Sequence, residues 1–107
     1  VTGVQTCALP LFQLRKFDVE RRYGAGQQLD KGDLRGVPGF TFECKNLGRI
    51  TLSDIMDETV REMNNAGTPF GVAIIKRRRK SAADAYAVMT LENFVDLLEI
   101  LLNNRVE

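Results

Sequence analysis

Hydrophobic and polar residues follow two different spacings along this chain, and the spacings predict an ordered series of strands and helices. Side chains that alternate with a period of two predict strands, whereas apolar residues at i, i+3 and i+4 predict helices. The alternation over residues 17–22 favours an exposed strand, with a short helix as the alternative. Residues 33–37 and 40–45 read as the strands of a hairpin. The pair Pro38-Gly39 between them favours a type II turn.

A helix is predicted over residues 51–66, where apolar residues recur at helical spacing. Thr51 is a suitable N-cap, and Asp54 three residues later comes close to the capping-box pattern. Gly67 supplies a left-handed stop, and Pro69 prevents the helix from continuing. The apolar residues of this predicted helix are Leu52, Ile55, Met56, Val60 and Met63.

The last third of the chain repeats the order of strand and helix. Residues 70–76 are an apolar run rich in strand formers and predict a central strand, followed by a charged loop at 77–83 and a strand at 84–89. Thr90 caps a second helix, which ends at Asn103 and Asn104. This helix has a broad apolar stripe, formed by Leu91, Phe94, Val95, Leu98, Leu101 and Leu102.

These elements predict an α/β fold, a mixed sheet of about five strands flanked by two helices. The chain has 107 residues, of which 44% are hydrophobic and 27% charged, with a formal net charge of +1. These values suit one small globular domain with a modest core. No apolar run is long enough to span a membrane.

The first ten residues, VTGVQTCALP, do not suit this domain. They lack the basic region and the sustained apolar core of a signal peptide, and they closely resemble translated sequencing-adapter read-through. We therefore treat residues 1–10 as an artefact and residues 11–107 as a single domain whose N-terminal part, including a helix, is expected to be missing. An ordinary disordered start is the alternative.

Cysteine and histidine usage limits the chemistry that the chain can perform. Without residues 1–10 the one remaining cysteine is Cys44, which suits a reducing cytoplasm. The chain contains no histidine, which excludes a histidine general base, a Ser/His/Asp triad and nearly all zinc sites of known type. Catalysis would then depend on carboxylates, lysine, tyrosine or a hard cation such as magnesium.

The most informative stretch runs from Gly32 to Lys45 and reads GDLRGVPGFTFECK. On the strand at 40–45, Phe42 and Cys44 point to one face, and Glu43 and Lys45 to the other. Asp33 is close enough in sequence to fold back toward them. Two carboxylates and a lysine could bind Mg²⁺ and cleave a phosphodiester, with the Cys44 backbone carbonyl as a third metal ligand. The alternatives are a same-face surface pair and an aspartate that serves only the turn.

Two basic groups could hold phosphates. One is an uninterrupted run of cations: Lys76, Arg77, Arg78, Arg79 and Lys80. The other includes Arg21 and Arg22. The alternative for the run is a solvated hairpin tip. The acids lie mainly in the predicted helices, so charge is segregated along the chain although the net charge is small.

The pattern GDLRG followed by FTFECK resembles the active-site hairpin of the PD-(D/E)XK nuclease superfamily, and within it the small Holliday-junction-resolvase-like proteins of phages and bacteria. The likeness covers residues 21–102. It implies a restriction-endonuclease-like core in which Asp33 is the first metal-binding acid, Glu43 the second and Lys45 the catalytic lysine. Members often carry a glutamine on the following helix, and Glu58 occupies the matching place here.

The resemblance implies a magnesium-dependent DNA endonuclease, with manganese as a substitute ion, that cuts branched DNA as a homodimer in the cytoplasm, including that of a phage host. A nicking or restriction-like enzyme would keep the fold and change the substrate. A non-catalytic nucleic-acid-binding or phage accessory protein would keep the fold without the reaction. A plain interaction domain would bind no DNA.

Overall fold

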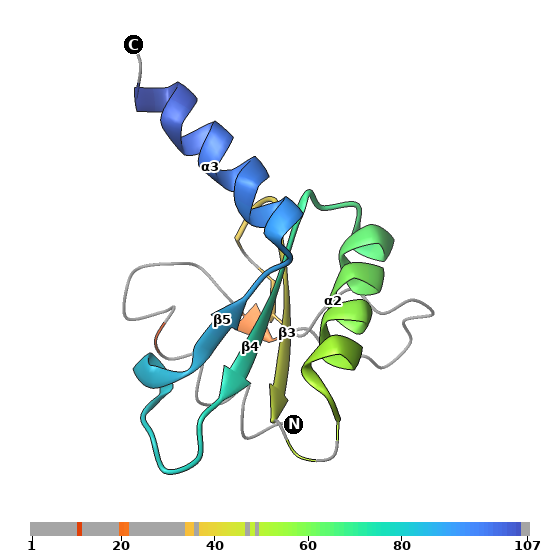
Figure 1. The fold of residues 1–107 in the computed structure, drawn as a ribbon, viewed down its shortest axis with the longest axis vertical. Coiled ribbons are helices and arrows are strands. Elements are labelled where there is room, and N and C mark those ends of the chain that lie inside the picture. The colour runs from red at the N-terminus through yellow and green to blue at the C-terminus, as the bar shows by residue number, and fades with distance from the viewer. Residues whose placement is uncertain are drawn as a thin grey trace.

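The computed structural model describes residues 11, 20–21, 34–35, 37–46, 48 and 50–105. Asp33 and Arg22, as well as residues 1–10, lie outside these described residues. Eight elements follow one another among the described residues (Figure 1): β1 (Glu20–Arg21), β2 (Leu34–Arg35), β3 (Phe40–Asn46), α2 (Leu52–Ala66), β4 (Phe70–Lys76), the 3-10 helix η1 (Ala82–Asp84), β5 (Tyr86–Val88) and α3 (Leu91–Arg105).

The strands form one mixed sheet in the order β1-β2-β3-β4-β5. β3 and β4 run parallel over seven residue pairs, from Phe40↔Phe70 to Asn46↔Lys76, and the other neighbours are antiparallel. β1 and β2 contribute only two residues each, so the extended part of the sheet has three strands, β3, β4 and β5. The predicted α/β class, with a mixed sheet and two helices, is therefore confirmed. Five full strands are not.

The turn between β2 and β3 has the predicted chemistry. The Phe40 N–H donates to the Val37 carbonyl at 3.2 Å, which closes a four-residue turn around Pro38 and Gly39. Gly39 has φ of 84°, the positive value that the third position of a type II turn requires. This turn reverses the chain so that Leu34 pairs with Phe42.

Helix α2 begins and ends where the sequence predicts. The Thr51 side chain accepts a hydrogen bond from the Asp54 N–H, and Gly67 ends the helix with φ of 71°. Its buried face differs from the apolar stripe, however. Ile55, Thr59 and Glu62 are buried, whereas Leu52 is 44% exposed. The helix is therefore rotated so that two polar residues face the sheet.

Two apolar clusters lie on the two faces of the sheet. Phe42, Cys44, Val72 and Ile74 form one of them. Ile55 of α2 packs on Ala73 and Ile75 to form the other. Alternation along β3 and β4 separates the clusters, because successive side chains point to opposite faces. Figure 1 shows α2 lying alongside β3 and β4.

The C-terminal region departs from prediction at two places. Asp84 belongs to η1, where its N–H donates to the Ser81 carbonyl, so β5 begins at Tyr86 rather than at residue 84. Helix α3 extends away from the sheet (Figure 1), and its expected packing stripe is exposed. Only its first turn is tied to β4, because the Asn93 side chain accepts from the Gly71 N–H at 2.9 Å.

Among the described residues, no helix combines the length and the apolar character that crossing a membrane requires.

Candidate functional site

The candidate site lies between β3 and α2, on the sheet face that α2 covers. Thr41, Glu43 and Lys45 alternate with the apolar residues of β3, so their side chains share this face. Glu43 is only 3% exposed, although it is an acid. Acids are rarely buried to this extent without a partner or a metal.

Four charged side chains meet at this place. Lys45 Nζ lies 3.0 Å from Glu58 Oε2 and 3.8 Å from Glu43 Oε1. Carboxylate oxygens of Glu43, Glu58 and Glu62 all lie within 4.8 Å of one another. Two of the three clustered carboxylates therefore contact one ammonium group, in a region where Glu43 and Glu62 are both buried.

Small residues in β4 let α2 come close enough to bring its acids to β3. A Cβ at Gly71 would lie 3.1 Å from Met63 Cβ and 3.3 Å from Thr59 Cγ2. Two positions along β4, the fully buried Ala73 contacts Ile55 of the same helix. Residues with larger side chains at these positions would move α2 outward and separate Glu58 and Glu62 from Glu43.

The two buried polar residues of β3 are satisfied differently. Thr41 shares a 2.7 Å hydrogen bond with the Thr68 hydroxyl, which in turn donates to the Phe70 carbonyl. Glu43 Oε2, by contrast, has no hydrogen-bond partner among the described residues. A buried carboxylate oxygen without a donor costs on the order of 1–3 kcal/mol. A bound cation at the cluster would remove that cost.

The structure brings together two of the three predicted catalytic residues. Glu43 and Lys45 share a face and a contact, as the alternation predicts. Asp33 lies outside the described residues, so its place in the site stays a prediction. The Cys44 thiol is buried on the opposite face, and its backbone belongs to the paired strand β3. The role of its carbonyl as a metal ligand also stays a prediction.

Helix α2 supplies two acids that the sequence reasoning did not assign to the metal. The resemblance puts Glu58 at the place of the family's glutamine, and here it forms an ion pair with Lys45 directly. Glu62 is one of the acids of this predicted helix, and the sequence motif gives it no role in the site. The signal that could have found it is the i, i+4 spacing of Glu58 and Glu62, because like charges at that spacing destabilise a helix unless something binds them both.

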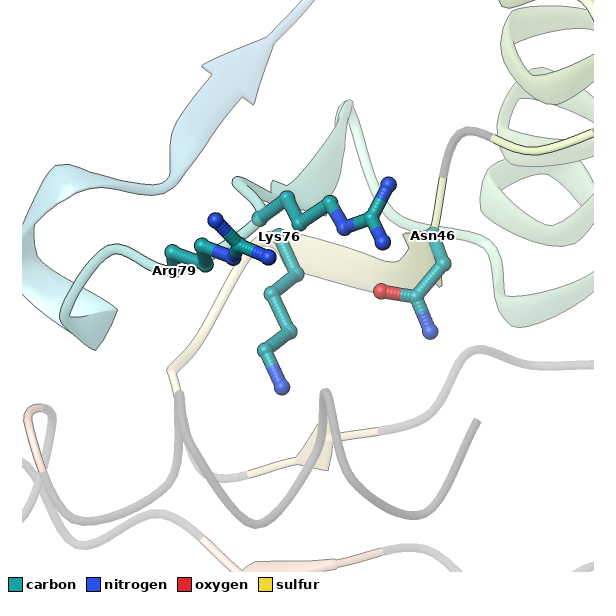
Figure 2. A pocket seen from close by; sticks show the side chains of 4 residues that line it. Asn46, Lys76 and Arg79 are labelled. Atoms are coloured by element: carbon teal, nitrogen blue, oxygen red, sulfur yellow. The ribbon is translucent and has the colours of Figure 1, made fainter.

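The predicted basic run is divided by its turn. Lys76, Arg78 and Arg79 line an open pocket of about 310 Å³ together with Asn46 (Figure 2). Arg77 instead lies over the Tyr86 ring, with its Cζ 4.8 Å from the ring centroid. Lys80 does not line this pocket, so its predicted contact with nucleic acid stays a prediction. The side chains of Arg21 and Arg22 lie outside the described part of the chain.

Comparisons with known proteins do not identify a family. No family model matches the chain, and searches of curated proteins and of solved structures find no match.

The arrangement suits a hard divalent cation. Mg²⁺ prefers oxygen ligands and is usually bound through one or two carboxylates while it keeps several waters. Glu43, Glu58 and Glu62 offer such oxygens close together. The buried Glu43 Oε2, which has no hydrogen-bond partner among the described residues, could bind the cation. The chain's own residues therefore fit the ion that the sequence motif implies.

Proposed function

We propose that this protein is a magnesium-dependent DNA endonuclease that hydrolyses phosphodiester bonds, of the branched-DNA or Holliday junction resolvase type. The observation that carries the proposal is the buried Glu43 carboxylate, with one oxygen unsatisfied among the described residues, beside Lys45 on the same strand. The likeness of GDLRG and FTFECK to the PD-(D/E)XK hairpin supports the reaction type.

In this proposal Glu43 holds the metal, with Asp33 as the other acid of the motif and the Cys44 carbonyl as a further ligand. Glu58 and Glu62 add oxygens from α2. Manganese would substitute for magnesium. The bound ion would polarise the scissile phosphate and lower the pKa of a bound water. Resemblance to the superfamily also implies a restriction-endonuclease-like arrangement of the core.

Lys45 is the residue suited to the reacting phosphate. Its Nζ is held between Glu58 and Glu43, and its side chain retains some exposure, so it can reach a ligand at the edge of the site. Hydrolysis forms a bond from a water oxygen to phosphorus and breaks the bond to the leaving sugar oxygen. Lys45 would donate a hydrogen bond to the phosphate oxygens on which negative charge develops.

The site lies near the carboxyl ends of two parallel strands. Lys45 and Asn46 end β3, and Lys76 ends β4 directly beside Asn46. In open α/β sheets ligands bind in the crevice outside these strand ends. The cations that follow β4 give this edge a positive potential suited to a polyanion such as DNA.

A homodimer, which the resemblance implies, gains support from the exposed stripe of α3. Leu91, Phe94, Leu98 and Leu101 repeat at the alternating three- and four-residue spacing of a helix-pairing face. Leu91 is 75% exposed and Leu101 is 52% exposed. Acids along the same helix would repel DNA, so we propose a second copy of this chain as the occupant. These acids are Glu92, Asp96 and Glu99.

The test uses a labelled four-way junction and a linear duplex of matched sequence, each with Mg²⁺. We expect cleavage of the junction and its loss, by roughly 100-fold or more, in Glu43→Ala and in Lys45→Ala. Asp57→Asn, an exposed acid on the same helix as Glu58, is the control and should retain activity. Retained cleavage in either site variant would refute the assignment.

The same measurement separates the alternatives. Equal cutting of the linear duplex would indicate a nicking or restriction-like enzyme. Salt-sensitive binding without cutting at any Mg²⁺ or Mn²⁺ concentration would indicate a non-catalytic nucleic-acid-binding or phage accessory protein. No DNA binding at low salt would leave a plain interaction domain.

A further inference from the structure

The basic run after β4 differs from a solvated hairpin tip in how its side chains are arranged. Lys76, Arg78 and Arg79 line a common pocket with Asn46 (Figure 2), and among the described residues no carboxylate lines it. Among the described residues none of these three cations forms an ion pair. A concave site with three positive charges and one amide has the composition of an anion site.

In the turn beside this pocket, Arg79 has a backbone conformation that favours glycine. The Lys80 N–H donates to the Arg77 carbonyl at 3.2 Å, which closes a turn with Arg78 and Arg79 at its centre. Arg79 has φ of 61°, and among the described residues it is the one non-glycine residue with positive φ. Glycine or asparagine usually occupies such a position. An arginine in this conformation costs backbone strain, so its side chain is a candidate for a functional role.

Arg77 is separated from this group. Its guanidinium lies over the Tyr86 ring, an arrangement that is stabilising in itself. Tyr86 belongs to β5, so Arg77 fastens the start of the turn to the neighbouring strand. Arg77 therefore contacts another part of the protein, whereas Lys76, Arg78 and Arg79 line an open pocket.

We propose that the pocket formed by Asn46, Lys76, Arg78 and Arg79 binds a backbone phosphate of a DNA strand, one that is not cut. This inference deepens the proposed function and rests on it for the identity of the polymer. Two arginines with planar forks suit phosphate oxygens, and the Asn46 amide can donate a further hydrogen bond. By strand alternation Asn46 and Lys76 point to the sheet face opposite Lys45, so a strand held here would reach the candidate catalytic site around the carboxyl ends of β3 and β4.

The experiment measures binding of a fluorescent duplex and junction by anisotropy, in EDTA, at several salt concentrations. Each phosphate contact contributes roughly 0.9 to the slope of log K against log salt. We expect Arg78→Ala and Arg79→Gly each to lower that slope by about one and to weaken binding several-fold. Arg79→Gly suits the positive φ, so its loss of binding could not be ascribed to misfolding.

Lys80→Ala is the matched control from the same run, because Lys80 is exposed and does not line the pocket, and it should leave the slope unchanged. An equal fall in slope for Lys80→Ala and Arg79→Gly would show a diffuse basic patch and overturn the pocket. An unchanged slope in Arg78→Ala and Arg79→Gly would also overturn it. Binding of a free mononucleotide that depends on these arginines, without any effect on DNA, would assign the pocket to a small phosphate ligand instead.

The outcome is independent of catalysis, because EDTA removes the divalent ion. A lowered slope with no cleavage under any conditions would support the pocket and end the nuclease proposal. Cleavage that needs Glu43, with an unchanged slope in the arginine variants, would support the nuclease and end the pocket.

Discussion

Glu43 has a conflict between its position and its charge. It stands on a buried strand face, where an apolar residue would stabilise the fold, and one of its oxygens lacks a donor among the described residues. Lys45 is shared between Glu43 and Glu58 and lies nearer to Glu58. Negative charges this close repel one another unless a cation is shared. The site is therefore a local cost to stability that a bound divalent ion would reverse.

That cost leads to a prediction for Glu43→Gln. The amide removes a buried charge and can donate to the neighbouring carboxylates, so the metal-free variant should unfold at a higher temperature than the wild type. A gain of about 1 kcal/mol corresponds to a rise in Tm of about 4–8 °C for a small domain. Thermal unfolding in EDTA and in Mg²⁺ measures both states.

Magnesium should stabilise the wild type but not this variant. At a concentration of 100 times the Kd, an ion that binds only the folded state adds about 2.7 kcal/mol. The control Asp57→Asn should keep the full magnesium increment, because its side chain is exposed on α2. A Glu43→Gln protein that is less stable in EDTA and still gains stability from magnesium would contradict this account of the cluster.

At the scale of elements, the site depends on how closely α2 approaches β4. Gly71→Ala places a methyl group 3.1 Å from Met63 Cβ and 3.3 Å from Thr59 Cγ2. We expect a loss of roughly 1–3 kcal/mol in the free energy of unfolding, the usual cost of overpacking, together with weaker binding of Mg²⁺. Urea denaturation measures the first and metal titration the second.

Two further variants test whether close packing is the cause. Gly48→Ala has no atom of the described residues within 4 Å of the added one and should change stability little. Met63→Ala removes the Met63 Sδ, another close neighbour of the new methyl group at 3.3 Å. The double variant should therefore show a favourable coupling energy relative to the two single changes. Simple additivity would show that Gly71 does not set the spacing between helix and strand.

The first and last residues of helix α2 were predictable from the sequence, and the face that it turns toward the sheet was not. Thr51 and Gly67 act through local hydrogen bonds and local backbone geometry, which the sequence carries directly. The apolar stripe, however, implied a buried Leu52, whereas α2 buries Thr59 and Glu62. Apolar residues at a spacing of 3.6 predict the buried face of a helix only if its polar residues face solvent. In α2 two polar residues face the sheet instead. The Glu43 and Lys45 pair was predictable because strand alternation does not depend on tertiary packing.

Across the whole molecule, the two helices differ in how far they join the sheet. α2 packs on β3 and β4, whereas α3 is fastened by Asn93 at its first turn and then extends away (Figure 1). Beside its base an apolar pocket of about 540 Å³ lies on the sheet face opposite α2. Leu91 and Phe94 belong both to this pocket and to the stripe, so the two apolar surfaces are continuous. Monomeric proteins rarely expose a continuous apolar surface of this kind.

The proposed homodimer gives this surface a use that can be measured. Leu98 lies in the middle of the stripe and is 38% exposed, so Leu98→Glu should leave the fold intact. In a two-fold dimer it would place two negative charges, one from each copy, at the apolar interface. We expect the wild type to show a concentration-dependent dimer in sedimentation velocity and Leu98→Glu to remain monomeric. Asp96→Ala, whose side chain lies two positions away on another face of α3, should leave the association unchanged.

A wild type that stays monomeric at high micromolar concentration would contradict the dimer. Loss of association in both variants would show that the pairing is electrostatic and that the apolar stripe is not the interface.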